Sequence, residues 1–263
     1  MRGCFFSTEA ERLRSNLPAT ASPRHGLARV LSKAGVCSRT QAQALVRGGR
    51  VQVNGRVVRD PESSTDAERD RIAVDGVAIA AREKIYIALN KPRGFVTTAS
   101  DEQGRDTVYT LLKNGDPGNV ELPWIAPVGR LDKASEGLLL FSNDSMWAAR
   151  LSDPASHLDK TYHVQVDIRP GTGLLDGLCA GTRADGEFLS AKSVRELRRG
   201  GKNSWLEVVL DEGRNRQIRR LLAAFDIDVL RLIRVAIGPL VLGDLAKGRW
   251  RLLNGEEISS LRL

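Results

Sequence analysis

The 263-residue sequence contains few of the side chains that bind metal ions or form disulfide bonds. It holds three cysteines and three histidines. Cys4, Cys37 and Cys179 are odd in number and far apart, which argues against a disulfide framework and against a C-x-x-C metal site. No segment approaches the roughly 18 uninterrupted apolar residues of a membrane helix. These absences argue against a membrane protein, a secreted disulfide scaffold and a metalloenzyme.

The charge of the chain is concentrated in one short segment. Lys and Arg number 40 against 32 Asp and Glu, a net charge of +8. The segment 24–59 holds eight basic residues and no acidic one, so the rest of the chain balances 40 − 8 = 32 basic against 32 acidic residues. A basic block in a neutral chain is typical of a module that binds a polyanion, although a solvated basic surface with no partner gives the same pattern.

The basic segment also predicts a compact structure. Apolar residues at helical spacing predict a helix over 27–34, and Ser38 is the predicted N-cap of a second helix that ends at Gly48. Alternating valines around Asn54-Gly55 then predict a β-hairpin. Two short helices and a hairpin that carry only positive charge can present cations to phosphate groups.

This segment resembles the alpha-L motif, the small RNA-binding domain named after the fourth small-subunit ribosomal protein. The resemblance is carried by LSKAGVCSR at 31–39 and GRVQVNG at 49–55, and it covers about residues 24–82. It implies recognition of folded RNA through shape and phosphate, without catalysis. The candidate RNA contacts in this domain are Lys33, Arg39 and Arg50.

Composition and turn signals predict three parts along the chain. Residues 1–23 are polar and show no sustained periodicity, which predicts a disordered leader. The RNA-binding domain spans 24–82 and closes with a second hairpin at Asp75-Gly76. The remaining residues, 83–263, form the second domain.

Strands separated by single helices are predicted in the second domain. Their order is neither strict alternation nor all strand, which predicts an α+β fold with a mixed sheet and helices on one side. The predicted strands span 85–89, 95–98, 137–141, 161–166, 205–210 and 229–235. The predicted helices span 108–112, 145–151, 174–178 and 217–224.

The segment GRLDKASEGLLLF at 129–141 is the first candidate for chemistry. It is a charged loop that runs straight into an apolar strand. Asp132 lies between the cations Arg130 and Lys133, which favour the ionised carboxylate that a nucleophile requires. Taken by its spacing alone, the same segment is more often a surface turn with a local ion pair.

Two further segments carry reactive or phosphate-binding side chains. Tyr162 opens a predicted strand and could stack on a base or act as a general acid or base, although the pattern alone favours an ordinary strand aromatic. The stretch EGRNRQIRR at 212–220 gathers four arginines. These suit phosphate binding or bidentate contact with a catalytic carboxylate, and an exposed basic helix is the competing interpretation.

Together with NKPRG at 90–94, these segments resemble the pseudouridine synthases that modify ribosomal RNA, in the branch named for the small-subunit enzyme. That branch also carries an alpha-L-type domain, and the resemblance runs from about residue 24 to 253. GRLDKASEGLLL and EGRNRQIRR are highly specific in combination. Ser135 and Ser142 stand where threonine is common, and Leu221 stands where methionine is frequent; none of the three is a reactive group.

The resemblance implies a catalytic domain on a mixed, largely antiparallel sheet with flanking helices, and a reaction without cofactor or metal. The bond from uracil nitrogen to ribose breaks, the base rotates, and it rejoins through carbon 5. Asp132 would be the catalytic carboxylate, attacking the sugar carbon or removing a sugar proton. Tyr162 would stack on the flipped uracil and assist proton removal from carbon 5, and Arg219 would pair with Asp132. The implied RNA contacts are Arg130, Lys91, Arg214 and Arg216, of which Lys91 would shape the pocket floor.

The implied protein is a cytoplasmic, monomeric enzyme that isomerises a uridine in ribosomal RNA or a pre-ribosomal particle, with the large subunit favoured. Two alternatives stay open. One is a non-catalytic RNA-binding or ribosome-assembly factor on the same scaffold, against which the joint presence of Asp132, Tyr162 and Arg219 weighs. The other is a nucleic-acid N-glycosylase, which would release free base.

Overall fold

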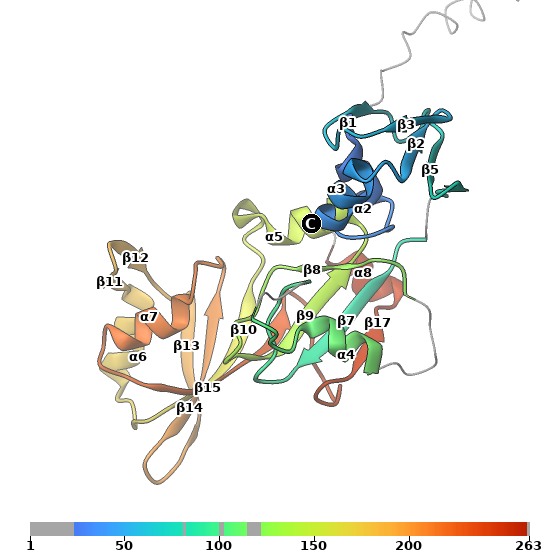
Figure 1. Cartoon of the computed structure of the whole chain (residues 1–263). Helices are drawn as coiled ribbons and strands as arrows, with labels where there is room; N and C mark the ends of the chain where they lie inside the picture. Colours follow the sequence, from blue (N-terminus) through green and yellow to red (C-terminus); the bar gives the residue numbers. More distant parts are fainter. Residues whose placement is uncertain (1–23, 81–82, 100–102, 115–121, 262–263) are drawn as a thin grey trace, which may run out of the picture. The chain divides into compact units, whose positions relative to one another are not determined.

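The computed structural model describes residues 24–80, 83–99, 103–114 and 122–261 (Figure 1). These residues form two units, one made of the described residues up to Leu31 with Arg39–Ile79, the other of Ser32–Ser38 with Ala80 onward. The division after Ile79 lies close to the boundary predicted between 82 and 83, and the assignment of domains to 24–82 and 83–263 stays a prediction. The predicted leader, 1–23, lies outside the described residues.

The first unit is built from two short helices and small antiparallel sheets. Its four-stranded sheet has the order β3-β2-β5-β6, and β1 pairs with β4. Asn54-Gly55 and Asp75-Gly76 form the hairpin turns with positive φ at both positions, which confirms both predicted hairpins. The elements are α2 (Leu27–Lys33), α3 (Arg39–Arg47), β1 (His25–Gly26), β2 (Val51–Val53), β3 (Arg56–Val58), β4 (Ser64–Thr65), β5 (Ile72–Val74) and β6 (Val77–Ala78).

A nine-stranded sheet organises the second unit. The main path has the order β13-β14-β10-β15-β9-β7-β17, with β16 paired to β15 and β8 to β9. Among the described strands of this sheet the β15–β9 pair is parallel and the others are antiparallel, which confirms the predicted mixed, largely antiparallel sheet. The strands are β7 (Tyr86–Lys91), β8 (Ala126–Val128), β9 (Glu136–Ser142), β10 (Lys160–Val166), β13 (Ser193–Arg199), β14 (Ser204–Leu210), β15 (Val229–Ile237), β16 (Leu240–Val241) and β17 (Trp250–Leu252).

Helices cover both faces of this sheet, so the prediction of helices on one side is wrong. Residues that alternate along β7 enter different cores: Ile87 packs with Val108 of α4, whereas Ala88 packs with Trp147 of α5. Strand β9 is buried along its whole length for the same reason. The helical elements are α4 (Val108–Asn114), α5 (Ser145–Ser152), the 3-10 turn η1 (Pro154–Ser156), α6 (Thr172–Ala180), α7 (Gln217–Ala223) and α8 (Gly255–Ser260).

The predicted strand at 95–98 is wrong as well. In the described structure this segment forms an isolated bridge between Val96 and Thr107 in place of a strand. The Thr97 hydroxyl donates instead to the carbonyl of Leu131, 2.7 Å away. The β-propensity of this stretch is therefore overridden by a tertiary contact with the loop that precedes β9.

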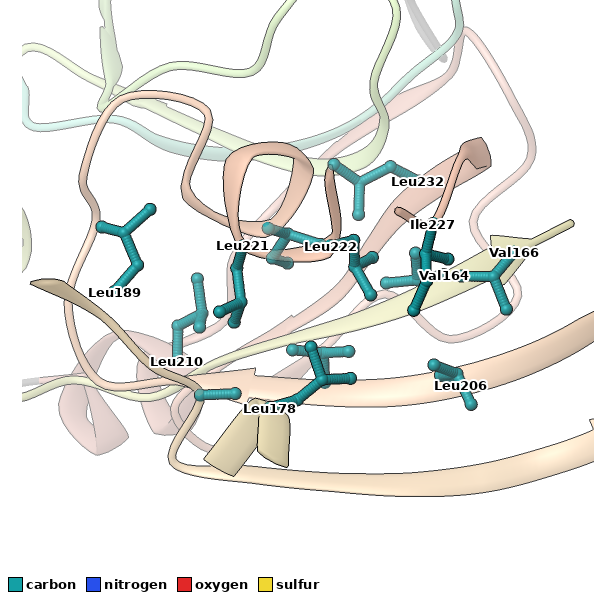
Figure 2. Packing of buried hydrophobic residues seen from close by; sticks show 13 residues of the cluster. Val164, Val166, Leu178, Leu189, Leu206, Leu210, Leu221, Leu222, Ile227 and Leu232 are labelled. Atoms are coloured by element: carbon teal, nitrogen blue, oxygen red, sulfur yellow. The ribbon is translucent and has the colours of Figure 1, made fainter. Parts of the chain in front are cut away.

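Opposite the β7–β9 end of the sheet, α6 and α7 pack on β10 and β14 together with the hairpin of β11 (Thr182–Ala184) and β12 (Glu187–Leu189) (Figure 1). Figure 2 shows Leu221 and Leu222 of α7 above Val164 and Leu206 of the two strands. All four side chains are at most 2% exposed. Strand β14 alternates buried and half-buried residues, as expected for a strand with one face on the core.

The parallel contact between β9 and β15 requires a glycine. Gly137 has φ +103°, and a Cβ there would lie 2.2 Å from the Arg234 backbone oxygen. An L side chain would therefore be strained in conformation and would clash with backbone atoms that cannot move aside. This close approach sets the two strands that carry the candidate site beside each other.

Candidate active site

A cleft of about 650 Å³ opens in the second unit between the loop before β9, the start of β10, the loop after β14 and strand β15. It is lined by six of the residues that sequence reasoning selected, which come from three segments far apart in the chain. These six are Arg130, Asp132, Tyr162, Arg214, Arg216 and Arg219.

Hydrogen bonds fix the backbone of the loop that carries Asp132. Thr97 accepts from the Leu131 N–H and donates to the Leu131 carbonyl. The N–H of Gly94 donates to the carbonyl of Lys133 over 2.8 Å. The Asp132 carboxylate is thus presented to the cleft from a loop that is tied to the segment after β7.

Lys91 donates hydrogen bonds to the backbone of the same loop. Its side chain is fully buried, and its Nζ donates to the carbonyl oxygens of Asp132 at 3.0 Å and Ser135 at 2.8 Å. Burial lowers the pKa of Lys91 to about 8, an effect that the carboxylates of Asp132 and Glu136 oppose.

These contacts correct the prediction that Lys91 binds RNA. Lys91 is absent from the residues that line the cleft, and its ammonium group points into the protein interior. Its ammonium group donates to the backbone of the loop that carries Asp132 and to the carbonyl of Pro92. The expectation that it shapes the pocket is consistent with this position beneath the loop.

A second anchor follows the loop at the start of β9. The buried carboxylate of Glu136 accepts two hydrogen bonds from Arg231, at 2.7 and 2.9 Å, and one from Lys247 at 2.7 Å. These contacts, Arg231 first, lower the pKa of Glu136 to about 2. Because Arg231 belongs to β15, this cluster fastens the loop end to the strand that forms another wall of the cleft.

The loop after β14 is held by its own polar side chains. Gln217, which is buried, accepts from the Arg214 N–H and donates to Glu212 and to the Ser190 carbonyl. Arg214 also donates to Glu212 over 2.8 Å. The loop is therefore shaped before any ligand binds, and Arg216 is presented at its end.

The ion pair with Asp132 is made by Arg216. Arg216 Nη1 lies 3.9 Å from Asp132 Oδ2, and the two side chains are 53% and 38% exposed. Sequence reasoning assigned this contact to Arg219 and gave Arg216 to the RNA.

Arg219 is half-buried and does not form an ion pair with Asp132 among the contacts of the described residues. It donates from its two terminal nitrogens to the carbonyls of Val229, at 3.3 Å, and Ala134, at 3.4 Å. Burial and the charge of Arg216 hold the pKa of Arg219 below its usual value, while the Asp132 carboxylate acts in the opposite direction. Arg219 therefore contributes charge near Asp132 and contacts the carbonyl two residues further along the same loop.

Tyr162 lies on the central strand of the site. It is opposite Val208 of β14 and Arg234 of β15, and its ring packs against two hydrophobic clusters, one that includes Leu131 and one that includes Ile218. Its side chain also lines the cleft and is only half-buried, so part of it is available to a ligand. An aromatic ring at this position can stack on a flat base.

Sequence reasoning missed two further cations of the cleft, Lys160 and Arg234. The pattern gave a partial signal for Lys160, because it lies two residues before Tyr162 and so on the same face of β10. Arg234 occurs in the apolar stretch VLRLIRVAI, where a basic residue reads as an interruption rather than as a site.

Two of the RNA contacts predicted in the segment 24–82 pair with acidic residues. Arg39 lies 3.5 Å from Glu62, and Arg50 Nε donates to Asp75 over 2.9 Å. Glu62 and Asp75 both come after the segment 24–59, which itself contains no acidic residue. Lys33 ends helix α2 and is half-buried.

Within the part of the chain that the structure describes, no helix is long and apolar enough to cross a membrane. Among those same residues, no three His, Cys, Asp or Glu side chains are grouped as a metal ion would require.

Residues 85–224, more than half of the chain, match the profile of the RNA pseudouridylate synthase family. The chain also shares 39% identity over 233 residues with an uncharacterized RNA pseudouridine synthase of Aquifex aeolicus (strain VF5), covering 88% of this chain and 91% of that protein. The chain belongs to the RNA pseudouridine synthase family. It therefore belongs to a class of enzymes that isomerise uridine in RNA.

Further similarities agree with this family membership. The ribosomal large subunit pseudouridine synthase B of Bacillus subtilis (strain 168) is 36% identical over 239 residues, 90% of this chain and 95% of that protein. A crystal structure of a pseudouridylate synthase superposes with a TM-score of 0.61 at 28% identity, covering 91% of this chain and all of the other. Residues 26–64 match the S4 domain, which confirms the expected RNA-binding module before a pseudouridine synthase fold.

Proposed function

We propose that this synthase isomerises one uridine of ribosomal RNA, with the large subunit as the favoured source. The observation that carries the proposal is the cleft in which Asp132 and Tyr162 lie together among arginine side chains. A carboxylate, an aromatic ring and cations for phosphate are the groups that a flipped uridine requires.

Asp132 is the proposed catalytic carboxylate, acting on the ribose of the flipped nucleotide. The bond from uracil N1 to the sugar breaks and a bond from uracil C5 to the same sugar carbon forms. The proton on C5 leaves, with help from Tyr162, and N1 gains one, so the product is an isomer of the substrate. Arg130, Arg214 and Arg216 contact the RNA, and Arg219 supports the loop and charge of Asp132.

The choice of ribosomal RNA is supported by two features. The S4 domain precedes the catalytic unit, and the Bacillus subtilis relative is named for the large ribosomal subunit. We propose that the enzyme acts as a single chain in the cytoplasm, on ribosomal RNA or a pre-ribosomal particle.

Tritium release from ribosomal RNA labelled at uracil C5 tests the activity. The protein is expected to release tritium, and Asp132→Asn is expected to abolish release while filter binding to the same RNA persists. Equal release by the variant would overturn the role of Asp132. Free labelled uracil in place of retained base would indicate an N-glycosylase, and binding without release by the parent would indicate an assembly factor.

Mapping then identifies the substrate. Carbodiimide-blocked primer extension across both ribosomal RNAs from a deletion strain should show one stop lost relative to the parent strain. A stop lost from the small-subunit RNA would contradict the preference for the large subunit.

A further inference from the structure

Two cations that the catalytic roles do not use flank Tyr162 in the cleft. Lys160 precedes it by two residues on β10, and Arg234 lies opposite it on β15. Both side chains line the cleft. The three residues therefore contribute neighbouring side chains to one wall of the cleft.

Arg234 is buried without full hydrogen bonding. The residue is 5% exposed, and its Nε donates to the Leu138 carbonyl over 2.8 Å. Its Nη2 is buried and has no hydrogen-bond partner among the described residues. Buried polar groups are almost always hydrogen-bonded, so an unpartnered guanidinium nitrogen in a ligand cleft indicates a group that the ligand satisfies.

Lys160 and Arg234 also repel each other. Burial, and next the charge of Arg234, lower the pKa of Lys160, whereas Asp159 and Asp211 raise it. Asp159 is already bound to Lys192 at 2.8 Å, and the described hydrogen bond of Lys160 Nζ goes to the Leu158 carbonyl. Two close cations without a bound carboxylate between them favour an anion.

The remaining acids of the cleft have partners of their own. Glu212 accepts from Arg214 and Gln217, and Asp132 lies near Arg216. No other carboxylate lines the cleft among the described residues. Asp159 and Asp211, which act on Lys160, do not line the cleft. Within the described lining of the cleft no carboxylate is left to pair with Lys160 or Arg234, so an anionic ligand can supply the counter-charge there.

We infer that Lys160 and Arg234 form a subsite for a backbone phosphate adjoining the flipped uridine. A phosphate oxygen can accept from Arg234 Nη2 while its charge relieves the repulsion between the two cations, which a neutral uracil carbonyl would not do. This assignment rests on the proposed function, because it takes RNA as the ligand. The subsite would bind a phosphate inside the cleft, next to the Tyr162 ring on which the base would stack.

The dependence of RNA binding on salt tests the subsite. Binding of an Asp132→Asn protein to a large-subunit ribosomal RNA transcript is measured by filter retention over a salt series. One lost contact to a phosphate of an unpaired nucleotide lowers the slope of log K against log salt by about 0.7. Lys160→Gln should show this decrease, while the charge-conserving Lys160→Arg should keep the slope of its parent.

Lys202→Gln is the matched control, because Lys202 is an exposed lysine outside the cleft. An unchanged slope for Lys160→Gln would overturn the subsite, and so would a loss of affinity at constant slope, which would indicate a neutral contact. An equal decrease of the slope for Lys202→Gln would show that any surface charge produces the effect, and this result would also overturn the subsite.

Arg234→Lys gives a second measurement. It keeps the charge but removes the fork that reaches a phosphate bidentately, so affinity should fall at least threefold; unchanged affinity would contradict the role of Arg234. Fluorescence of the four tryptophans, all of which lie in the second unit, verifies folding. Absence of tritium release by the parent protein would reject the proposed function while leaving the salt slopes to decide the subsite.

Discussion

Arg216 Nη1 lies 3.9 Å from Asp132 Oδ2, so the carboxylate proposed for catalysis is paired with an arginine from the loop after β14. Both side chains are more than a third exposed, and exposed ion pairs contribute about 0–1 kcal/mol. Arg219 has the opposite character, because it is half-buried and donates to the carbonyls of Ala134 and Val229. Two neighbouring arginines thus act on the same loop in different ways.

Substitution of the two arginines should separate these effects. Arg216→Gln loses a weak, exposed pair, so kcat should fall less than about fivefold while RNA affinity falls. Arg219→Gln loses the buried contacts that connect the Asp132 loop to β15, so kcat should fall by about tenfold or more. Single-turnover rates and filter binding distinguish the two, and a larger loss of kcat in Arg216→Gln than in Arg219→Gln would reverse the assignment.

The hydroxyl of Tyr162 should matter more than its ring for the chemical step. Tyr162→Phe keeps the stacking surface but removes the group proposed to assist proton removal from C5, which is worth about 10²- to 10⁴-fold in rate. RNA binding should therefore persist while tritium release slows. Tyr109→Phe is the control, because the Tyr109 hydroxyl donates to the Ile125 carbonyl and does not line the cleft. Normal release by Tyr162→Phe would restrict Tyr162 to stacking.

Local signals predicted the elements of this fold better than the contacts between them. The Asn54-Gly55 and Asp75-Gly76 turns and the apolar strand at 137–141 follow from short-range physics, and the structure confirms them. The segment 95–98 fails because Thr97 binds a distant loop rather than a neighbouring strand. The two-sided burial of β7 is invisible in sequence, because a short buried strand does not reveal which helix covers each face.

The same limit applies to the candidate site. The charged loop, Tyr162 and the arginine cluster could be selected from spacing and family resemblance. The arginine that reaches Asp132 could not be identified in this way. Arg216 comes just before α7 and has a positive φ, so its side chain does not follow the helical spacing that the sequence pattern assumes. Arg234 was overlooked because a cation inside a buried strand has meaning only once its unpartnered nitrogen is found in a cleft.

Glu136 should make the second unit sensitive to acid. Its pKa is about 2 in the folded protein, below the usual 4.5, so its stabilisation is complete above about pH 4.5 and is lost as pH falls towards 2. The difference corresponds to about 3 kcal/mol in the free energy of unfolding. Glu136→Gln should lower stability at pH 7 by up to about that amount and flatten the dependence on pH between 4.5 and 2.

Urea unfolding followed by tryptophan fluorescence measures this effect, since all four tryptophans lie in the second unit. Glu83→Gln, which changes an exposed side chain, should retain the acid dependence of the parent. If Glu136→Gln kept the same dependence on pH as the parent, the contacts with Arg231 and Lys247 would not stabilise the fold.

Asp75 should weaken RNA binding by the first unit, because its carboxylate forms an ion pair with the Arg50 guanidinium. The carboxylate of Asp75 accepts from Arg50, and Asp75 has φ 50° at the first position of its hairpin turn. Asn tolerates this conformation and favours the same turn before glycine, so Asp75→Asn removes the negative charge without changing the hairpin. Arg50 is then free to bind phosphate, and affinity for ribosomal RNA should rise by about two- to fivefold, the range expected of an exposed ion pair.

Arg50→Gln should act in the opposite direction, lowering affinity and reducing the salt slope by about 0.7–0.9, as the loss of one phosphate contact predicts. Asp75→Asn combined with Arg50→Gln should bind no better than Arg50→Gln alone, because the gain depends on the freed guanidinium. The measurement is filter binding of full-length Asp132→Asn proteins over a salt series. A gain in affinity that survives in the double variant would show that Asp75 acts by general repulsion of RNA, and an unchanged slope in Arg50→Gln would remove Arg50 from the RNA contacts.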